Sequence, residues 1–573
     1  MTMRRAIIVF GVLAALNVAA YLLPVRWDMT DDKHYSLSKA SKALLRQSDA
    51  PIEVTLLLEG DLNAGFRRLK KATEETIAEM NVFGDVRCTM YDVQFTMHNS
   101  QFTIHDADSL GLRPIVIHER EQNGKTAQTT VYPYAIMSYK GRKAVVTLLK
   151  NTRGLSGEEN LNASIEQLEF AFMEALHLLQ QTETPRVAIL EGHGEPDEAH
   201  TYDLMSALSK YFAVDRGQLA SNDGMSATAS LNDELIDVHI LDGYKAVIVL
   251  NPQTAFSEQE RFVIDQYIMR GGAVLWSLNG VRFSETVLQS EGFTPILPLE
   301  LGLTDMLFRY GVRVNPALVQ DVQCLPIPVN VSSDPSQPNL QPMPWTYAPL
   351  LLTSQGSPIT KNMGQVMSTF VSPIDAVGGE DGIEKRVLLA TSTASRVTAT
   401  PGEVDLNDLN PDMAAFQYQY VPVAVSMEGV FPSAFAHRMI PEGIESDEPI
   451  RKTSAKTRQV VIGSGSILLN ETQKGQVLPM GYDRYSGMQF SNRDFAANAM
   501  LWLTDSEGLI SLREKSIALR LLNDKRAHEE RQQVQAISTI LPVAILAIIG
   551  GIVFVIRKRK YVKGESLKLK VES

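Results

Sequence analysis

The residues best suited to chemistry lie close together in one short stretch of the chain. They are Glu191, Gly192, His193, Gly194 and Glu195. With Glu198 and His200 just beyond, this stretch holds the imidazole and carboxylate groups that bind zinc. However, no helical His-Glu-x-x-His pattern is present, and Pro196 breaks any helical register, so we predict no metal here. The two glycines indicate a tight loop capped by its own polar side chains, and we predict this loop as the ligand-binding position.

Two other patterns come near to known catalytic or nucleotide sites without completing them. Residues 463–466, with Ser464 and Ser466, follow a strand but lack the spacing of a hydrolase or amidotransferase nucleophile elbow. Residues 123–126 resemble the end of a phosphate loop, but Glu119 stands where the earlier glycine is required. The sequence therefore predicts a protein that is not an enzyme and that carries no nucleotide or other cofactor.

The elements around residues 191–195 predict an α/β fold. Residues 186–190 form an apolar strand, so the loop would lie at a carboxyl strand end, where open α/β sheets bind ligands. A second strand, helix and strand follow at 245–250, 257–269 and 273–277, with Ser257 and Glu260 spaced as a capping box. This rhythm predicts a doubly wound, mostly parallel sheet.

That sheet belongs to a large α/β domain over residues 185–505. Its later elements are predicted at 386–390, 421–427, 459–462 and 493–503. Residues 318–413 are rich in Pro, Ser and Asn and lose the regular pattern, so they are predicted as an irregular insertion, with loops at 334–338 and 341–345. Residues 439–458 are predicted as a second exposed loop.

A smaller α/β domain precedes the large one, at residues 26–150. Helices are expected at 38–46 and 65–81, and strands at 51–58, 86–93, 113–117, 134–139 and 143–149. A thioredoxin-like arrangement is one candidate, without redox chemistry because no Cys-x-x-Cys is present. A strongly periodic helix at 162–179, within a connecting segment 160–182, is expected to join the two domains.

Both ends of the chain carry apolar runs long enough to cross a bilayer, at residues 6–23 and 536–556. Basic residues flank them on their outer sides, namely Arg4, Arg5, Arg557, Lys558, Arg559 and Lys560. Since such residues stay in the cytoplasm, both termini are predicted to be cytoplasmic, with the large domain in the periplasm. Residues 509–535 read as a helical stalk leading to the second span. A cleaved signal peptide is the alternative for the first run.

Composition narrows the classes of partner. The net charge of −12 argues against a nucleic-acid partner, which would require a basic surface. Cys88 and Cys324 follow no metal-ligand spacing, and two interpretations stay open for them: small buried hydrophobic side chains or one disulfide.

The chain resembles the GldG family, the membrane-anchored auxiliary subunits of the gliding-motility ABC transporter, over nearly its whole length. The stretches that carry the resemblance are 58–61, 65–69, 164–169, 190–195, 264–272, 308–315, 345–350 and 479–482. One departure stands out, because Ser464-Gly465-Ser466 occupies the place of an expected Asp-Gly-Asp. Any cation or polar ligand that those two carboxylates would hold is therefore in doubt.

The resemblance implies a set of partners and a location. It implies an ABC permease, a cytoplasmic ATPase and the lipid bilayer of the bacterial inner membrane, with other envelope components as further candidates. It also implies a substrate-binding-like auxiliary role in transport. The alternative functions are a ligand- or glycan-binding module of the envelope and, further off, a hydrolase or amidotransferase-like enzyme.

Overall fold

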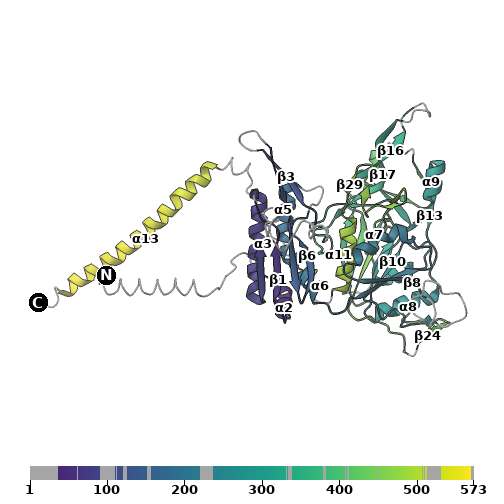
Figure 1. Cartoon of the computed structure of the whole chain (residues 1–573), viewed down its shortest axis with the longest axis horizontal. Helices are drawn as coiled ribbons and strands as arrows, with labels where there is room; N and C mark the ends of the chain where they lie inside the picture. Colours follow the sequence, from purple (N-terminus) through teal and green to yellow (C-terminus); the bar gives the residue numbers. More distant parts are fainter. Residues whose placement is uncertain are drawn as a thin grey trace, which may run out of the picture. The chain divides into compact units, whose positions relative to one another are not determined.

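The computed structural model describes residues 36–568 except 61, 91–109, 111, 121–125, 151–155, 220–235, 331, 333–338, 379–381, 407, 410–411, 447, 506–507, 509, 511 and 513–530. The chain divides into two compact units, 1–516 and 517–573 (Figure 1). Within the first unit, we name residues 36–180 the small lobe and residues 186–512 the large lobe. Each lobe has its own main sheet.

The small lobe is built on a four-stranded sheet in the order β2-β1-β5-β6. The strands are β1 Ile52–Leu56, β2 Val86–Met90, β5 Tyr134–Tyr139 and β6 Arg142–Thr147. β1 and β2 are parallel because helix α3 (Ala64–Phe83) carries the chain back between them. β5 pairs antiparallel with β1, and β6 pairs antiparallel with β5. Helix α2 (Lys39–Arg46) begins at the predicted cap Ser38, and a separate hairpin pairs β3 (Ile115–Arg120) with β4 (Thr126–Val131). The strand and helix predictions for this lobe are confirmed where they fall on described residues, while its thioredoxin-like character stays a prediction.

The single helix predicted at 162–179 is wrong, because the structure has two helices there. α5 (Gly157–Glu166) and α6 (Leu168–Gln180) meet at Gln167, which ends the first helix and begins the second. The sequence hides this break because the apolar spacing continues across it, with Leu168, Phe172 and Leu176 buried. α6 packs on β5 and β6, so it is part of the core of the small lobe as well as the link to the large one.

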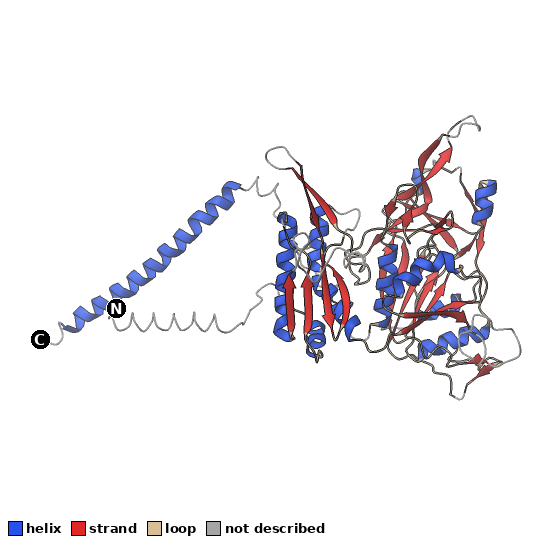
Figure 2. Cartoon of the chain, viewed as in Figure 1, coloured by secondary structure: helices blue, strands red, loops and turns tan. Residues whose placement is uncertain are grey.

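The large lobe is built on a ten-stranded sheet, half of which is parallel. Figure 2 shows strands of this lobe in red with helices in blue around them. The parallel half has the order β8-β7-β10-β11-β25. Its strands are β7 Arg186–Glu191, β8 Ala213–Gln218, β10 Ala246–Leu250, β11 Ala273–Ser277 and β25 Thr457–Ile462. The apolar runs predicted the strands at β7, β10, β11 and β25, and these predictions are confirmed.

The other half of this sheet is antiparallel, which corrects the prediction of a mostly parallel sheet. It contains β23 Pro422–Gly429, β20 Glu384–Ala390, β17 Leu340–Thr353, β16 Cys324–Asn330 and the short β18 Val366–Met367. The predicted irregular insertion 318–413 therefore supplies strands of the main sheet, and the loop predicted at 341–345 lies inside β17. Prolines obscured β16 and β17, but most of β17 pairs only with the edge strand β16, where proline is tolerated.

Alternate side chains of the parallel strands feed two apolar cores, one on each face of the sheet. In β10, Ile248 belongs to the core beneath α7 (Glu198–Leu208) and α11 (Asn492–Thr504). Val247 and Val249 belong to the core beneath α8 (Glu258–Met269) and α10 (Thr304–Tyr310). Because helices cover both faces, the central strand β10 is buried and apolar throughout, as a buried parallel strand requires.

Smaller elements complete the large lobe. They are β9 Ile236–Asp237, β12 Val281–Arg282, α9 Glu285–Glu291, β13 Phe293–Pro298, β14 Arg313–Val314, β15 Ala317–Asp321, β19 Ile374–Asp375, β21 Ser395–Ala399, β22 Gly402–Asp405, a 3-10 turn at Met413–Ala415, β24 Ile444–Glu445, β26 Thr472–Gln473, β27 Gln476–Val477, β28 Tyr482–Asp483 and β29 Met488–Gln489. Residues 439–458, predicted as an exposed loop, are largely irregular and contain β24.

The described part of the second unit is one long helix, α13 (Arg531–Lys568). Its segment Thr539–Ile556 has a mean hydropathy of 2.8 and is long and apolar enough to cross a bilayer. It is the one such helix among the residues described. The predicted span at 6–23, with Arg4 and Arg5, lies outside the described residues, as does most of the predicted stalk 509–535.

The two cysteines do not form a disulfide. Cys88 is exposed on the edge strand β2, and Cys324, at the start of β16, is half-buried. The disulfide interpretation is therefore wrong, and the interpretation as buried side chains fails for Cys88. Burial raises the pKa of the Cys324 thiol to about 11, so that thiol is protonated at neutral pH.

Candidate functional site

The predicted loop 191–195 follows β7, the strand at which the order of strands in the sheet changes direction. From β7 the chain first adds β8 on one side, and later adds β10 on the other side of β7. Such a switch point, at the carboxyl ends of the strands, is where open α/β sheets usually bind ligands. The loop turns sharply there because Gly192 and Gly194 have φ angles of +113° and +78°, which glycine adopts without strain.

His193 is the centre of the loop, and it points into the protein. The residue is 5% exposed, and its ring stacks on Phe256 with 3.7 Å between the ring centroids. Its Nε2 lies 3.2 Å from Glu260 Oε2, and its Nδ1 lies 3.4 Å from Glu195 Oε1. His193 Nδ1 and Glu195 Oε1 are close enough for an ion pair but lack good hydrogen-bond geometry. Neither of these two atoms makes a hydrogen bond to a described residue.

This environment keeps His193 charged. Burial by itself would lower the pKa of the imidazole, but the carboxylates of Glu195 and Glu260 outweigh it and raise the pKa to about 9. At neutral pH the side chain is therefore a buried imidazolium between two carboxylates. A protonated ring has no free lone pair for a metal or for accepting a proton.

Glu260 joins the loop to the start of α8. Its Oε2 accepts hydrogen bonds from the Ser257 backbone N–H at 2.8 Å and from Ser257 Oγ at 2.7 Å, which completes the predicted capping box. Burial tends to raise the pKa of Glu260, but His193 and Ser257 lower it overall. One carboxylate thus caps a helix and neutralises the histidine of a loop 67 residues earlier in the chain.

Glu191 and Glu195, at the two ends of the loop, are also occupied. Glu191 pairs with Arg216 of β8 at 2.5 Å, and the same guanidinium donates to Pro196 O and to Thr201. Glu195 Oε2 accepts the backbone N–H of His193 at 2.7 Å. Most polar groups of the loop therefore have partners within the loop or on β8 and α8, as expected of a structural joint.

The neighbouring loops fill the rest of the switch point. The backbone N–H groups of Gln253 and Thr254, after β10, donate to His193 O at 2.7 and 3.0 Å. Asn279 Nδ2, after β11, donates to Asn251 Oδ1 at 2.9 Å, while Asn279 Oδ1 accepts the Gly465 N–H at 2.8 Å. Four successive strand ends are thus joined by direct contacts. That this edge binds a ligand stays a prediction.

Other residues singled out in the sequence take structural roles. Asp197 caps α7 and holds His200 Nδ1 at 2.6 Å, so that imidazole is engaged by the capping carboxylate. Ser466 Oγ lies 3.0 Å from Ser464 Oγ and donates to Thr369 O at 3.0 Å. Among the described residues, no group of three or more His, Cys, Asp or Glu side chains could hold a metal ion.

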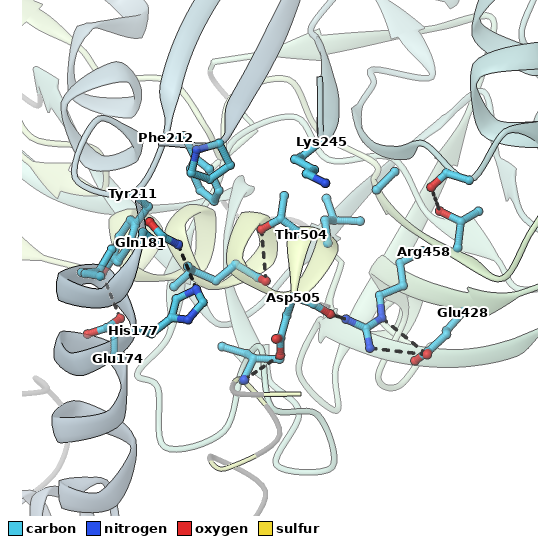
Figure 3. A pocket seen from close by; sticks show the side chains of 18 of the residues that line it. Glu174, His177, Gln181, Tyr211, Phe212, Lys245, Glu428, Arg458, Thr504 and Asp505 are labelled. Atoms are coloured by element: carbon cyan, nitrogen blue, oxygen red, sulfur yellow. Dashed lines mark hydrogen bonds and ion pairs between the residues drawn. The ribbon is translucent and has the colours of Figure 1, made fainter. Parts of the chain in front are cut away.

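A cavity lies at the opposite edge of the sheet, where the same strands begin, and we name it the amino-edge cavity. It has a volume of about 560 Å³ and lies beside Lys245, just before β10, Ala273 of β11 and Thr457 of β25 (Figure 3). His177 and Gln181, from the end of α6 and the residue after it, form the facing wall, with the His177 and Gln181 Nε2 atoms 2.8 Å apart.

Charged groups around this cavity are largely paired. Tyr211 donates to Glu174 Oε1 at 3.0 Å, joining the large lobe to the small one (Figure 3). Arg458 Nη1 donates to Trp502 O at 2.7 Å and Asp505 O at 2.8 Å, and so caps the carboxyl end of α11. Sequence reasoning missed this cavity because its wall comes from segments scattered between residues 170 and 510, none of which carries a motif.

Comparison with known proteins identifies the class. The architecture defines a mixed α/β protein with a large lobe, a small lobe and an apolar carboxyl-terminal helix. A family model described as an ABC-type uncharacterized transport system matches residues 184–499, and a domain of unknown function (DUF7088) matches residues 31–138. Because the first match covers more than half of the chain, the protein belongs to that ABC transporter auxiliary family.

The other comparisons add little. No curated protein matches the chain. Four chains of solved structures match, one of them titled "mmIFT52 N-terminal domain", with 13% identity over 56% of this chain and 98% of that chain, and a TM-score of 0.30. A likeness at that TM-score carries no argument about fold or function.

Proposed function

We propose that the protein is a membrane-anchored, extracytoplasmic auxiliary subunit of an ABC transport complex of the gliding-motility type. It works with a permease and a cytoplasmic ATPase and does not hydrolyse ATP itself. The observation that carries the proposal is the family match over residues 184–499, in a chain whose second unit contains an apolar helix. The resemblance of the sequence to GldG proteins supports the finer assignment.

The charge around α13 supports an outward-facing body. The apolar segment Thr539–Ile556 is followed directly by Arg557, Lys558, Arg559 and Lys560. Basic residues next to a span stay on the cytoplasmic side, so the chain before the span would lie in the periplasm of the bacterial inner membrane. Arg4 and Arg5, before the apolar run 6–23, would place the amino terminus on the same side as the carboxyl tail.

The structure of the loop 191–195 supports a role without catalysis. His193 is buried and protonated, so it is a poor general base at neutral pH, and Glu260 is engaged by a helix cap. In our proposal the loop holds the central strands of the large lobe together, and the body acts by binding its partners.

Co-purification tests the proposal. The full chain, tagged and extracted in mild detergent from its own cells, is expected to retain a multi-span permease and an ABC ATPase. The matched control is the chain ending at residue 530, which keeps both lobes but lacks α13 and should lose most of the permease. Recovery of the full chain as a clean monomer, under conditions in which a known membrane complex stays assembled, would contradict the partnership.

A further inference from the structure

A second cavity, of about 580 Å³, lies between the small lobe and the large lobe. Its small-lobe wall includes β6 and the junction of α5 with α6, and its large-lobe wall includes α11 and residues 489–491. This cavity and the amino-edge cavity share Phe170, Glu174 and Tyr211 as a common wall. Apart from these three residues, the two cavities are lined by different side chains.

Gln167, one of the residues that line this cavity, carries an unused hydrogen-bond acceptor. The residue is 7% exposed, and its Oε1 accepts no hydrogen bond from any described residue. Leaving an amide oxygen buried and unpaired destabilises a fold, so such groups are rare in native proteins. The terminal amide torsion of glutamine is soft, so this oxygen can turn toward a donor in the cavity without movement of either helix.

Asn498 offers a second amide from the opposite wall. It is 6% exposed on α11, and its Nδ2 donates to Ile359 O at 2.9 Å and contacts Met363 Sδ at 3.2 Å. These contacts fix the amide nitrogen toward the large lobe. The oxygen, on the other branch of the amide, receives no hydrogen bond from a described residue.

The charges on and directly beside the wall balance one another. Lys210 lies 3.8 Å from Glu174, and Arg493 pairs with Asp203 just outside the cavity. The remaining charged wall residues, Lys150 and Asp494, have opposite signs. Phe170 and Phe490 add apolar surface. A wall with neutral acceptors, balanced charge and aromatic faces suits an uncharged ligand that carries hydrogen-bond donors.

We propose that this cavity binds a neutral small molecule bearing O–H or N–H donors, which bridges Gln167 of the small lobe and Asn498 of the large lobe. A saccharide and a short uncharged peptide share this chemistry. The ligand would supply the missing donor to Gln167 and join the two lobes across their interface. Binding is a property of the isolated chain, so it stands or falls independently of the partnership with a permease.

The test uses the full-length chain in detergent and two sets of probes. One set consists of neutral di- and trisaccharides, and the other of acetylated and amidated di- and tripeptides without charged side chains. Binding is measured by titration calorimetry and by the shift in Tm. We expect saturable binding and a rise in Tm with members of one set, and which set binds identifies the donor as hydroxyl or amide.

Gln167→Leu is the decisive variant. Leucine fills similar space without the unpaired oxygen, so the free protein should gain about 1–3 °C in Tm, while affinity for the probe falls at least about tenfold. Gln180→Leu, at the other end of the helix α6 that Gln167 precedes, is the matched control. Gln180 Nε2 already donates to Ser48 Oγ at 2.8 Å and Leu44 O at 3.3 Å, so this change should lower the Tm and leave affinity for the probe unchanged.

A third variant keeps the proposal testable if Gln167→Leu folds poorly. Ala497→Met narrows the cavity from α11 without touching either amide and should weaken probe binding by about tenfold or more. The proposal is overturned if no probe of either set binds at a concentration of about 10 mM, which is well above the dissociation constant of about 1 mM that even a weak site would have. It is equally overturned if binding survives in both Gln167→Leu and Ala497→Met.

Discussion

The two edges of the parallel half-sheet differ in how their loops are used. At the carboxyl edge, His193, Asn251, Asn279 and Gly465 join four strand ends by direct contacts. At the amino edge the same strands begin around a cavity of about 560 Å³ (Figure 3). The usual ligand-binding edge of an α/β sheet is therefore the better packed edge in this protein. Position in a fold suggests a site, but the contacts of the residues decide it.

The largest expected difference comes from removing one histidine at each edge. His193→Ala should lower the free energy of unfolding by about 3–4 kcal/mol, because it leaves the buried Glu195 and Glu260 carboxylates without their cation. His177→Ala, at the amino-edge cavity, should cost only about 0.5–1 kcal/mol, since the hydrogen bond to Gln181 is only partly buried and no buried carboxylate pair depends on this histidine. Urea unfolding of both variants measures the contrast, and equal losses would contradict it.

The charge on His193 should make the stability of the carboxyl edge depend on pH. The folded-state pKa is raised from 6.5 to about 9, so the stabilisation is fully present below pH 6.5 and is lost as the pH rises through about 9. The expected loss between pH 6 and pH 9.5 is about 2–3 kcal/mol. His193→Gln, which cannot titrate, should lack this component, and parallel pH profiles for the two proteins would exclude the buried imidazolium.

Glycine substitutions compare the packing of the two edges. A Cβ at Gly463, just after β25, would lie 2.2 Å from the Ser372 backbone oxygen, so Gly463→Ala should destabilise by about 2–3 kcal/mol. A Cβ at Gly243, just before β10 at the amino edge, would meet nothing within 4 Å, so Gly243→Ala should change stability by less than about 0.5 kcal/mol. Thermal unfolding would show whether the two variants separate.

The smallest expected effects come from two ion pairs that join the same two strands. The pair Arg216–Glu191 lies at the carboxyl ends of β7 and β8, and its side chains are 13% and 26% exposed. The pair Arg186–Asp215 lies toward the amino ends of the same strands, and its side chains are 55% and 38% exposed. Arg216→Ala should cost about 1–2 kcal/mol, since it also releases Pro196 O. Arg186→Ala should stay within about 0.5 kcal/mol. A larger loss for Arg186→Ala would reverse the comparison.

Local patterns predicted the parts of the fold that local physics decides. The apolar runs at β7, β10 and β11 and the capping box of Ser257 with Glu260 could be read directly from neighbouring residues. In the antiparallel half, the strands predicted at 386–390 and 421–427 are confirmed as β20 and β23, but the proline-rich β16 and β17 could not be predicted. The antiparallel direction was also hidden, because it depends on pairing between distant segments, as of β23 with β25.

The candidate site was predictable only in outline. The glycines correctly predicted a sharp loop after β7, but no sequence pattern tells that Glu260, a helix-capping residue, also reaches His193. The break at Gln167 was equally hidden, since apolar spacing continues through it. Both cavities depend on residues from distant segments, which only the folded chain brings together.

The central functional claim is that both lobes lie outside the cytoplasm while the basic tail after the α13 span stays within it. Protease added to intact spheroplasts, with antibodies to the large lobe and to a tag on the carboxyl terminus, tests this claim directly. The account predicts that the large lobe is digested while the tagged fragment beyond Ile556 survives until the membrane is permeabilised. Survival of the large lobe together with loss of the tag would contradict it.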